Sequence, residues 1–442
     1  MPRTLFSSTL CILLFCGTLL LSQEPVTREL SLAEAIKLAL EQNPELQAEA
    51  YDLLAAEAQS QALSAERKPQ LDFVAGAFYH LRDQRLLPAS YNGDLGAFSD
   101  KMLAGDFVLS MPLYTGGRLS SQINASRLQR LASEKRLVYS REELLFNVIS
   151  VFYQSLAQER MIESLKFSHQ ALEEHMKKIE EMLSVQKAAA LDRLRVEVRV
   201  ADLRQRLLQA ENIMRVQNQV LANLLGLGEH LQTVKPSGCL QELPLPEEIP
   251  PCDYERCLQQ RGDYQAAAAA VSAQEQILQS AKAGFMPTVA LQASYGRRIA
   301  LNSPQRAQGL DSNRENGWLG LSMQIPIISS GQLRAEVRRE KARLLAAKAR
   351  LQKLELQIKL EISTARLNIN AAKQRLDALS KASEQAEESL RIEREKYELG
   401  KGSITEVLDA QTALLDSQTN YCGTLADLHV AKAQLKLAQG SK

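Results

Sequence analysis

The chain has 442 residues, of which 45% are hydrophobic and 24% are charged, so it is long enough to bury a large core. Its formal net charge of +1 arises from interleaved basic and acidic residues, which excludes the strong positive field that nucleic acid binding requires. The low aromatic content and long stretches rich in Ala, Leu, Gln, Glu and Lys indicate long helices or coiled coils.

The first predicted element is a secretion signal over residues 1–23. Arg3 provides its positive end, and residues 10–21 form an apolar run that is too short to cross a bilayer as a helix. Cleavage is expected near residues 22–24. Cys16 leaves a lipoprotein interpretation open, although Phe15 stands where a small residue is expected before a lipidated cysteine.

An internal repeat organises the rest of the chain. Residues 24–225 and 254–442 each contain, in the same order, a helical run, a pair of strands and a long helical hairpin. The correspondence is clear where residues 112–119 (PLYTGGRL) recur as residues 326–333 (PIISSGQL). Residues 226–253 are rich in glycine and proline and form the expected linker between the two halves.

The helical run of the first half is expected over residues 31–67. Ser31 and Glu34 have the spacing of a capping box, and Pro44 interrupts the run because proline disfavours helix at the residue before it. The matching run of the second half is expected over residues 254–284.

Two strands follow each helical run, at residues 71–80 and 103–114 and at residues 289–299 and 317–328. Apolar and polar side chains alternate along all four, which is typical of membrane barrel strands. An ordinary half-buried soluble sheet would alternate in the same way. Two such pairs, each placed between very long helices behind a signal peptide, favour the barrel. The intervening residues 81–102 and 300–316 are expected to be outward loops.

Aromatic side chains on these strands are candidates for interfacial girdles or for plain barrel packing: Phe73, Tyr79, Phe107, Tyr114, Tyr295 and Trp318. Four strands cannot close a barrel that has a lumen. Open sheet edges are excluded in lipid, because every backbone donor and acceptor must be paired there. Several chains must therefore pool their strands.

Long helical tracts follow the strands. Residues 118–225 and 332–399 contain no glycine and no proline. One helix over residues 118–184 would measure roughly 100 Å, which suggests a coiled-coil arm. Residues 400–403 (GKGS) end the arm of the second half, and Ser403 can cap the helix that follows. The internal repeat alone predicts the matching break near residues 185–188.

The chain resembles the TolC-like outer-membrane efflux family over essentially its whole mature length. The stretches that carry the resemblance are residues 31–44 (SLAEAIKLALEQNP), residues 112–118 (PLYTGGR) and residues 397–411. The resemblance implies a homotrimer with a shared twelve-stranded barrel in outer-membrane lipid and a periplasmic tunnel of helices. It also implies docking on a periplasmic adaptor, the membrane fusion protein, which is fed by an inner-membrane pump or an ABC transporter.

The expected fold class is therefore mainly α with a membrane β-barrel, in which each chain contributes long coiled-coil hairpins and four strands. The expected function is that of an outer-membrane exit duct for a tripartite efflux pump or a type I secretion system. A secreted periplasmic coiled-coil scaffold without a pore is the alternative, but it leaves the strand pairs unexplained. The transported substrate is not evident in the sequence.

Candidate working residues lie after the second predicted turn. Glu406 and Asp409 are one helical turn apart and share a helix face. By similarity they match the family's acidic ring at the inner entrance, where a trimer would gather carboxylates that attract cations and repel anions. Two ordinary acids on a solvated helix face are the alternative interpretation. Asp192 and Arg195 hold the equivalent positions of the first half, and contacts among these four residues and Tyr397 are hypothesised to hold the entrance closed.

The two hairpin turns are expected to contact the adaptor by the same analogy. The residues concerned are Val185, Gln186, Lys187 and Ala188 in the first turn and Gly400, Lys401, Gly402 and Ser403 in the second. Small residues permit close approach of a partner helix, but they also simply suit tight turns. The first turn lacks the glycine that the family often has there, which leaves the shape of that contact open.

Catalytic, metal and cofactor sites are not expected in this chain. No HExxH, GxSxG or P-loop pattern is present, and nothing supports the interpretation as a soluble enzyme on a helical frame. Cys239, Cys252 and Cys257 lie in one loop-rich segment that can hold a disulfide in an oxidising compartment. Cys422 lies in a helical pattern and is expected to be an unpaired buried thiol.

Overall fold

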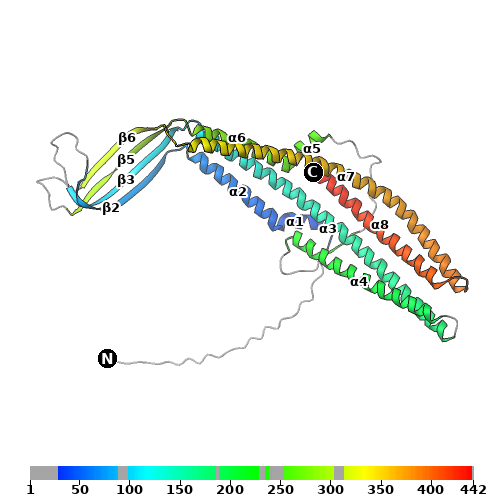
Figure 1. Ribbon diagram of the computed structural model, residues 1–442. Helices are drawn as coiled ribbons and strands as arrows, with labels where there is room; N and C mark the ends of the chain where they lie inside the picture. The colour runs from blue at the N-terminus through cyan, green and yellow to red at the C-terminus, as the bar shows by residue number, and fades with distance from the viewer. Residues whose placement is uncertain are drawn as a thin grey trace, which may run out of the picture.

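The computed structural model is an elongated molecule, with a four-stranded sheet at one end and two helical hairpins that reach to the other (Figure 1). It describes residues 28–87, 98–185, 189–227, 234–238, 240, 253–302 and 313–440. The predicted signal peptide, with Cys16, lies outside the described residues. Within the described ranges, no helix combines the length and the apolar character that crossing a membrane requires.

The helical run near the N-terminus is divided into α1 (Leu32–Gln42) and α2 (Pro44–Ala65). Both halves of the predicted capping box at Ser31 are present, and Asn43 separates the two helices at the predicted position. The Asn43 side chain accepts a hydrogen bond from the backbone N–H of Leu46 (3.0 Å) and donates one to the carbonyl of Leu224 (2.9 Å). This residue therefore caps α2 and also fixes it to a helix 181 residues later in the chain.

The long helices are α3 (Arg118–Ser184) and α7 (Gln332–Glu398), each of 67 residues, and each returns through a shorter helix, α4 (Ala190–Leu224) or α8 (Ile404–Gln439). The break that only the internal repeat predicted is confirmed, since α3 ends at Ser184 and α4 begins at Ala190. Buried side chains of α7 follow a spacing of four and three residues: Ile358, Ile362, Ala365, Ile369, Ala372 and Leu376. This spacing is that of a coiled-coil seam.

The second helical run is divided at Arg261 into α5 (Tyr254–Gln260) and α6 (Gly262–Ala283). The Arg261 side chain is only 2% exposed, and its guanidinium donates to the carboxylates of Asp263 (2.7 Å) and Glu361 (2.8 Å). It also donates to the carbonyl of Ala438 (3.3 Å) and lies over the ring of Tyr139. Arg261 therefore joins α6 to α3, α7 and α8 through a single buried cation.

A short parallel pair, β1 (Arg28–Leu30) and β4 (Val234–Pro236), connects the start of the chain to the linker between its halves. Cys257 is disulfide-bonded, while Cys239 and Cys252 lie outside the described residues. Cys422 is a free, half-buried thiol, as predicted from its helical pattern.

The four-stranded sheet has the order β2-β3-β5-β6, with every neighbouring pair antiparallel. Its strands are β2 (Gln70–Arg85), β3 (Phe98–Tyr114), β5 (Thr288–Asn302) and β6 (Asn313–Gln324). Residues 81–102 and 300–316 were predicted to be loops from their polar composition. Parts of both ranges instead belong to these strands. The prediction was wrong there because backbone pairing in a hairpin continues past the apolar stretch that marks a strand in the sequence. At the other end β6 stops before Pro326, which has no N–H to donate.

The two faces of this sheet differ in chemistry. The apolar face carries the row Leu71, Leu109, Ala293 and Leu319 and, next to it, the row Phe73, Phe107 and Tyr295. The polar face carries Asp106 and Arg298, whose side chains form an ion pair at 2.7 Å. The register also assigns the aromatic girdle candidates to faces. Phe73, Phe107 and Tyr295 lie on the apolar face, whereas Trp318 pairs with Ser294 on the polar face. Rows of apolar side chains on one face and polar side chains on the other are typical of a sheet between water and lipid.

Candidate functional site at the hairpin turns

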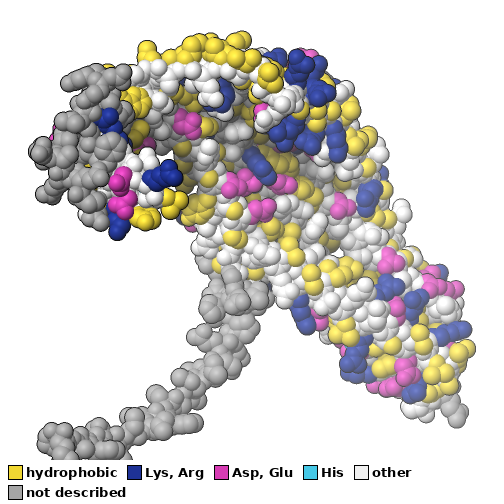
Figure 2. Space-filling model, turned by 60° about the vertical axis from the view of Figure 1, so that its left-hand side comes forward, with side chains coloured by type: hydrophobic (Ala, Val, Ile, Leu, Met, Phe, Trp, Pro, Cys, Tyr) yellow, Lys and Arg dark blue, Asp and Glu magenta, His cyan; other side chains and the backbone are white. Residues whose placement is uncertain are grey.

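The candidate site lies at the end of the molecule opposite the sheet, where the turns after α3 and α7 are located (Figure 1). Acidic, basic and apolar side chains are interleaved on this end of the surface (Figure 2). Val185 is exposed in the first turn, and Gln186, Lys187 and Ala188 lie outside the described residues. In the second turn, Lys401 and Ser403 are exposed, and Gly400 has a φ of +70°, a left-handed conformation that glycine adopts without strain.

Glu406 is held by the helix it begins. The backbone N–H of Ser403 donates to Oε2 of Glu406 (2.9 Å), and the Ser403 hydroxyl accepts from the N–H of Glu406 (3.3 Å). This is the capping box that the sequence predicted. Asp409 follows on the same exposed face, while Val407 and Leu408 point into the core. The two carboxylates therefore share a solvent-facing surface, and the capping box fixes one of them in place.

Asp409 pairs with a residue of α4 that the sequence did not single out. Its carboxylate lies 3.6 Å from the guanidinium of Arg199, one helical turn beyond Arg195. Arg195 instead donates to the hydroxyl of Thr405 at 3.1 Å and lies 3.9 Å from Asp192 on its own helix. Two neighbouring contacts between α4 and α8 therefore each include one residue of the hypothesis, Arg195 or Asp409. Asp192 pairs only within α4, and Glu406 is held in its own capping box.

A third contact continues this series. Arg206 lies 3.6 Å from Asp416, seven residues beyond the Arg199–Asp409 pair on both helices. Seven-residue spacing of opposite charges on two helices is a known signal of pairing along a coiled coil. That signal was present in the sequence, but finding it required the register of α4 against α8.

The space between α4 and α8 forms a groove of about 620 Å³. Its apolar lining comes from exposed side chains of α4, including Leu191, Leu194 and Val198, and its polar lining includes Arg199 and Asp409. At this groove the two helices therefore meet mainly through long charged side chains, which lie above an apolar cluster that both helices share with α3. Exposed pairs of this kind contribute about 0.2–1 kcal/mol each, so this contact is weaker than the core on which α7 and α8 pack.

Tyr397 lies on the other side of α8, against α3. Its ring and that of His175 are 5.4 Å apart between centroids, and both line a pocket of about 190 Å³. Burial raises the pKa of Tyr397, and the negative charge of Asp192 raises it further. Burial lowers the pKa of His175, and the cations of Lys178 and Arg394 add to that effect while Glu398 opposes it. Both rings are therefore held in their neutral forms. The negative charge of Asp192 on α4 acts on the Tyr397 hydroxyl of α7.

The groups available at this end of the molecule are exposed carboxylates and guanidinium groups along the groove between α4 and α8. Within the described part of the chain, no group of three or more His, Cys, Asp or Glu side chains is arranged to hold a metal ion. The exposed carboxylates of Glu406 and Asp409 attract cations, and the contacts between α4 and α8 are weak enough to separate.

Comparison with known proteins places the chain among transport proteins of the outer membrane. The family model described as outer membrane efflux protein matches residues 35–227 and 254–441. The outer membrane protein OprJ of Pseudomonas aeruginosa is 25% identical over 416 residues, which cover 90% of this chain and 82% of that protein. The outer membrane protein TolC of Escherichia coli is 27% identical over 175 residues, 38% of this chain and only 35% of TolC.

Solved structures share the fold at lower identity. The CmeC outer membrane channel of Campylobacter jejuni superposes with a TM-score of 0.80 at 17% identity, over 92% of this chain and 85% of that one. The outer membrane protein VceC of Vibrio cholerae gives a TM-score of 0.76 at 20% identity, over 92% and 96% of the two chains. The arrangement of sheet and hairpins described above is therefore that of these proteins.

Proposed function

Because this chain belongs to the outer membrane efflux protein family, we propose that it forms the exit duct through which a tripartite efflux pump or a type I secretion system delivers its substrates outside the cell. The sheet is anchored in the outer membrane, and the helices extend into the periplasm. The observation that carries the proposal is a sheet at the end of helices about 100 Å long, with rows of leucine and aromatic side chains on one face and a polar opposite face that carries the Asp106–Arg298 ion pair. Transport through such a duct requires no chemistry from the chain.

A homotrimer is part of this proposal. Within one chain, β2 and β6 are the outer strands of the sheet, so each presents an edge that lipid cannot satisfy. Apolar side chains such as Val198 and Leu208 on α4 and Leu360 and Leu367 on α7 are also exposed in the single chain. Large exposed apolar surface on a helix marks a protein interface, and copies of the same chain could cover it.

The remaining assignments extend the same proposal. The division into residues 24–225, 226–253 and 254–442 rests on the paired order of helices and strands. The exposed turns at Val185 and at residues 400–403 are the proposed contacts for a periplasmic adaptor supplied by an inner-membrane pump or ABC transporter. Glu406 and Asp409 are the proposed acidic ring, and the contacts of α4 with α8 are proposed to keep the entrance closed.

The trimer can be tested by mass. The protein extracted from the outer-membrane fraction in mild detergent should have the mass of three chains and should precipitate when detergent is removed, because the pooled sheet exposes an apolar band. The mass is measured by light scattering with correction for detergent. A detergent-independent monomer or dimer in the periplasmic fraction would instead favour a coiled-coil scaffold.

The acidic ring predicts cation preference. The double variant Glu406→Gln and Asp409→Asn should bring the ratio of cation to anion permeability toward one, because it removes the carboxylates at the constriction. Gln is chosen at position 406 because its side chain can still accept the hydrogen bond from the N–H of Ser403 and so keep the cap. Reversal potentials in planar bilayers measure the ratio.

The matched control for this variant is Asp427→Asn, an exposed acid of α8 that pairs with Arg375 far from the turn. It should leave the permeability ratio unchanged. Equal ratios for the wild type and the double variant would show that Glu406 and Asp409 are ordinary surface acids.

A further inference from the structure

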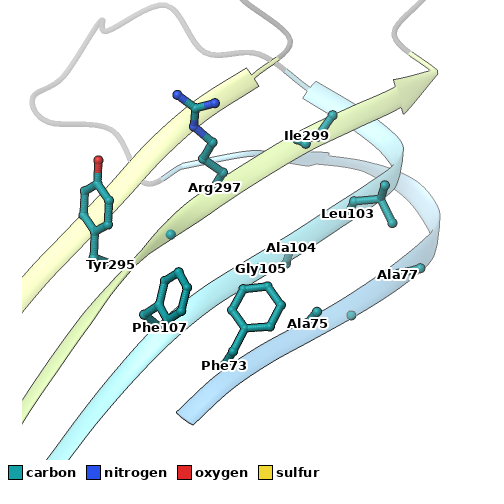
Figure 3. A pocket seen from close by; sticks show the side chains of 12 residues that line it. Phe73, Ala75, Ala77, Leu103, Ala104, Gly105, Phe107, Tyr295, Arg297 and Ile299 are labelled. Atoms are coloured by element: carbon teal, nitrogen blue, oxygen red, sulfur yellow. The ribbon is translucent and has the colours of Figure 1, made fainter. Parts of the chain in front are cut away.

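The apolar face of the sheet contains a hollow of about 630 Å³ (Figure 3). Two aromatic rings from neighbouring strands, Phe73 and Phe107, bound it on the side nearer the helices, with centroids 5.0 Å apart. Its floor is made of small residues, Ala75, Ala77 and Gly105. The hollow exists because rows of large and small side chains follow one another on this face.

The register of the strands produces these rows. Phe73 pairs with Phe107 and Phe107 with Tyr295, which gives a continuous aromatic row across three strands. In the next row, Ala75 pairs with Gly105, and the ring of Phe73 leans over that glycine. A Cβ added at Gly105 would lie 3.3 Å from Cζ of Phe73, so the ring occupies the space that a side chain would otherwise need.

Polar groups border the hollow on its β5–β6 side and beyond its end away from the helices. On β5 and β6, Arg297 forms an ion pair with Glu315, which also accepts a hydrogen bond from the Tyr295 hydroxyl at 2.9 Å. On β3, the ammonium of Lys101 lies 5.9 Å from the ring centroid of Tyr79. Among the described residues, no carboxylate pairs with Lys101, so the net charge of this border is positive.

This border runs obliquely across the sheet. On β5, Arg297 lies two rows further from the helices than Ala293, in the row of Gly105. On β3, Lys101 lies two rows further still, so the polar side chains on the two strands are at different distances from the helices. Strands in a membrane barrel are tilted by about 35–45°, so a plane parallel to the membrane crosses them at different rows. The oblique line of Tyr, Arg, Glu and Lys side chains therefore has the character of the outer membrane–water interface, where amphipathic side chains collect.

The hollow lies directly on the lipid side of that line. The opposite face of the sheet is the more polar one, with Asp106, Ser294 and Arg298, and so faces the aqueous lumen, which leaves the hollow facing the outer leaflet. This placement rests on the proposed function. An empty space against lipid loses dispersion contacts on one side, so a neighbouring acyl chain would fill it.

We propose that the hollow between the aromatic row and Lys101 seats an acyl chain of a phosphorylated outer-leaflet glycolipid, whose phosphate contacts the Lys101 ammonium. The small floor admits the chain, and the aromatic row stops it on the side toward the helices. The ion pair of Arg297 with Glu315 leaves Lys101 as the uncompensated cation of this border. Lys101 is therefore expected to bind a phosphate of the lipid headgroup rather than an uncharged sugar.

The test compares two lipids on the delipidated protein. Purified lipid A and its dephosphorylated form are titrated against the detergent-solubilised trimer, and bound lipid is counted by native mass spectrometry. Wild-type protein should bind lipid A about fivefold more tightly than the dephosphorylated form, because one cation near an anionic headgroup contributes about that factor. Lys101→Gln should remove this preference and leave the binding of the dephosphorylated form unchanged.

A second pair of variants tests the hollow itself. Ala75→Phe fills the floor and should abolish binding of both lipids, whereas Ala293→Phe, on the same face but outside the hollow, should not. Equal binding by these two variants, or no loss of preference in Lys101→Gln, would overturn the proposal. A trimer that conducts in bilayers but binds neither lipid would reject this site alone, whereas a protein that forms no conducting trimer would reject the proposed function.

Discussion

Replacing both Arg199 and Arg206 by Asp should increase the fraction of time for which the channel is open, by about 5- to 30-fold. The two arginines contact Asp409 and Asp416 across the α4–α8 groove, and reversal converts both attractions into repulsions. Exposed pairs contribute about 0.2–1 kcal/mol each, so two reversals amount to about 1–2 kcal/mol, which corresponds to that factor. Single-channel recording in planar bilayers measures the open fraction.

Charge restoration separates this effect from damage to α4. Arg206 also lies 3.1 Å from Asp202 on its own helix, so the reversal places two acids one turn apart there. Adding Asp409→Arg and Asp416→Arg to the reversed protein restores the pairs between helices but not the pair within α4. Recovery of the closed state in that quadruple variant would assign the effect to the α4–α8 contacts.

A matched control comes from the same helix. Arg204 is an exposed arginine of α4, and no carboxylate of the described residues forms an ion pair with it. Arg204→Asp should therefore leave the open fraction within a factor of two or so, the spread expected for a surface substitution. An increase as large as that of the double reversal would mean that the charge of α4 as a whole, rather than its contacts with α8, controls the opening.

The arrangement of the fold could be predicted from the sequence because its signals are local or repeated. Alternation marks the strands, Ser31 and Ser403 mark helix starts, and the absence of glycine and proline marks the long arms. The break between α3 and α4 has no local signal, and only the internal repeat predicted it. The ends of the strands were missed, since hydrogen bonding between strands extends into polar residues that resemble loops.

The candidate site was predictable only in part. Glu406 and Asp409 share an exposed face because helical spacing alone dictates it. Their partners depend on how far α8 is shifted along α4, and one helical turn decides whether Asp409 meets Arg195 or Arg199. Weak surface pairs do not fix such a shift, which is set instead by the apolar core below them. Side-chain pairing between distant segments was therefore beyond what the sequence pattern could give.

Arg261 shows the same limit in the core and leads to the largest predicted effect on stability. No sequence pattern predicted a role for Arg261, yet it lies buried between Asp263 and Glu361, the second of which is 100 residues away. Burial lowers the pKa of the guanidinium, but the hydrogen bonds that it donates to both carboxylates more than reverse that effect, so the cation is retained. Its removal would leave two carboxylates without their counter-charge.

Arg261→Met should lower the free energy of unfolding of the helical region by about 3 kcal/mol. Removing one partner of a buried ion pair typically costs about 3–5 kcal/mol, and the lower end applies because Glu361 is 33% exposed and can be hydrated. Far-UV circular dichroism during urea titration in detergent measures the change. Arg130→Met is the control, since Arg130 pairs with Glu57 at the surface and should cost less than about 1 kcal/mol.

The triple variant Arg261→Met, Asp263→Asn and Glu361→Gln identifies the cause of that loss. If uncompensated carboxylates are responsible, neutralising them should recover much of the stability lost in Arg261→Met, because no charge then remains buried. If the triple variant is no more stable than Arg261→Met, the loss arises instead from the packing of the arginine against Tyr139 and the carbonyl of Ala438. In that case the guanidinium acts as a space-filling link among α3, α6 and α8 rather than as a counter-charge.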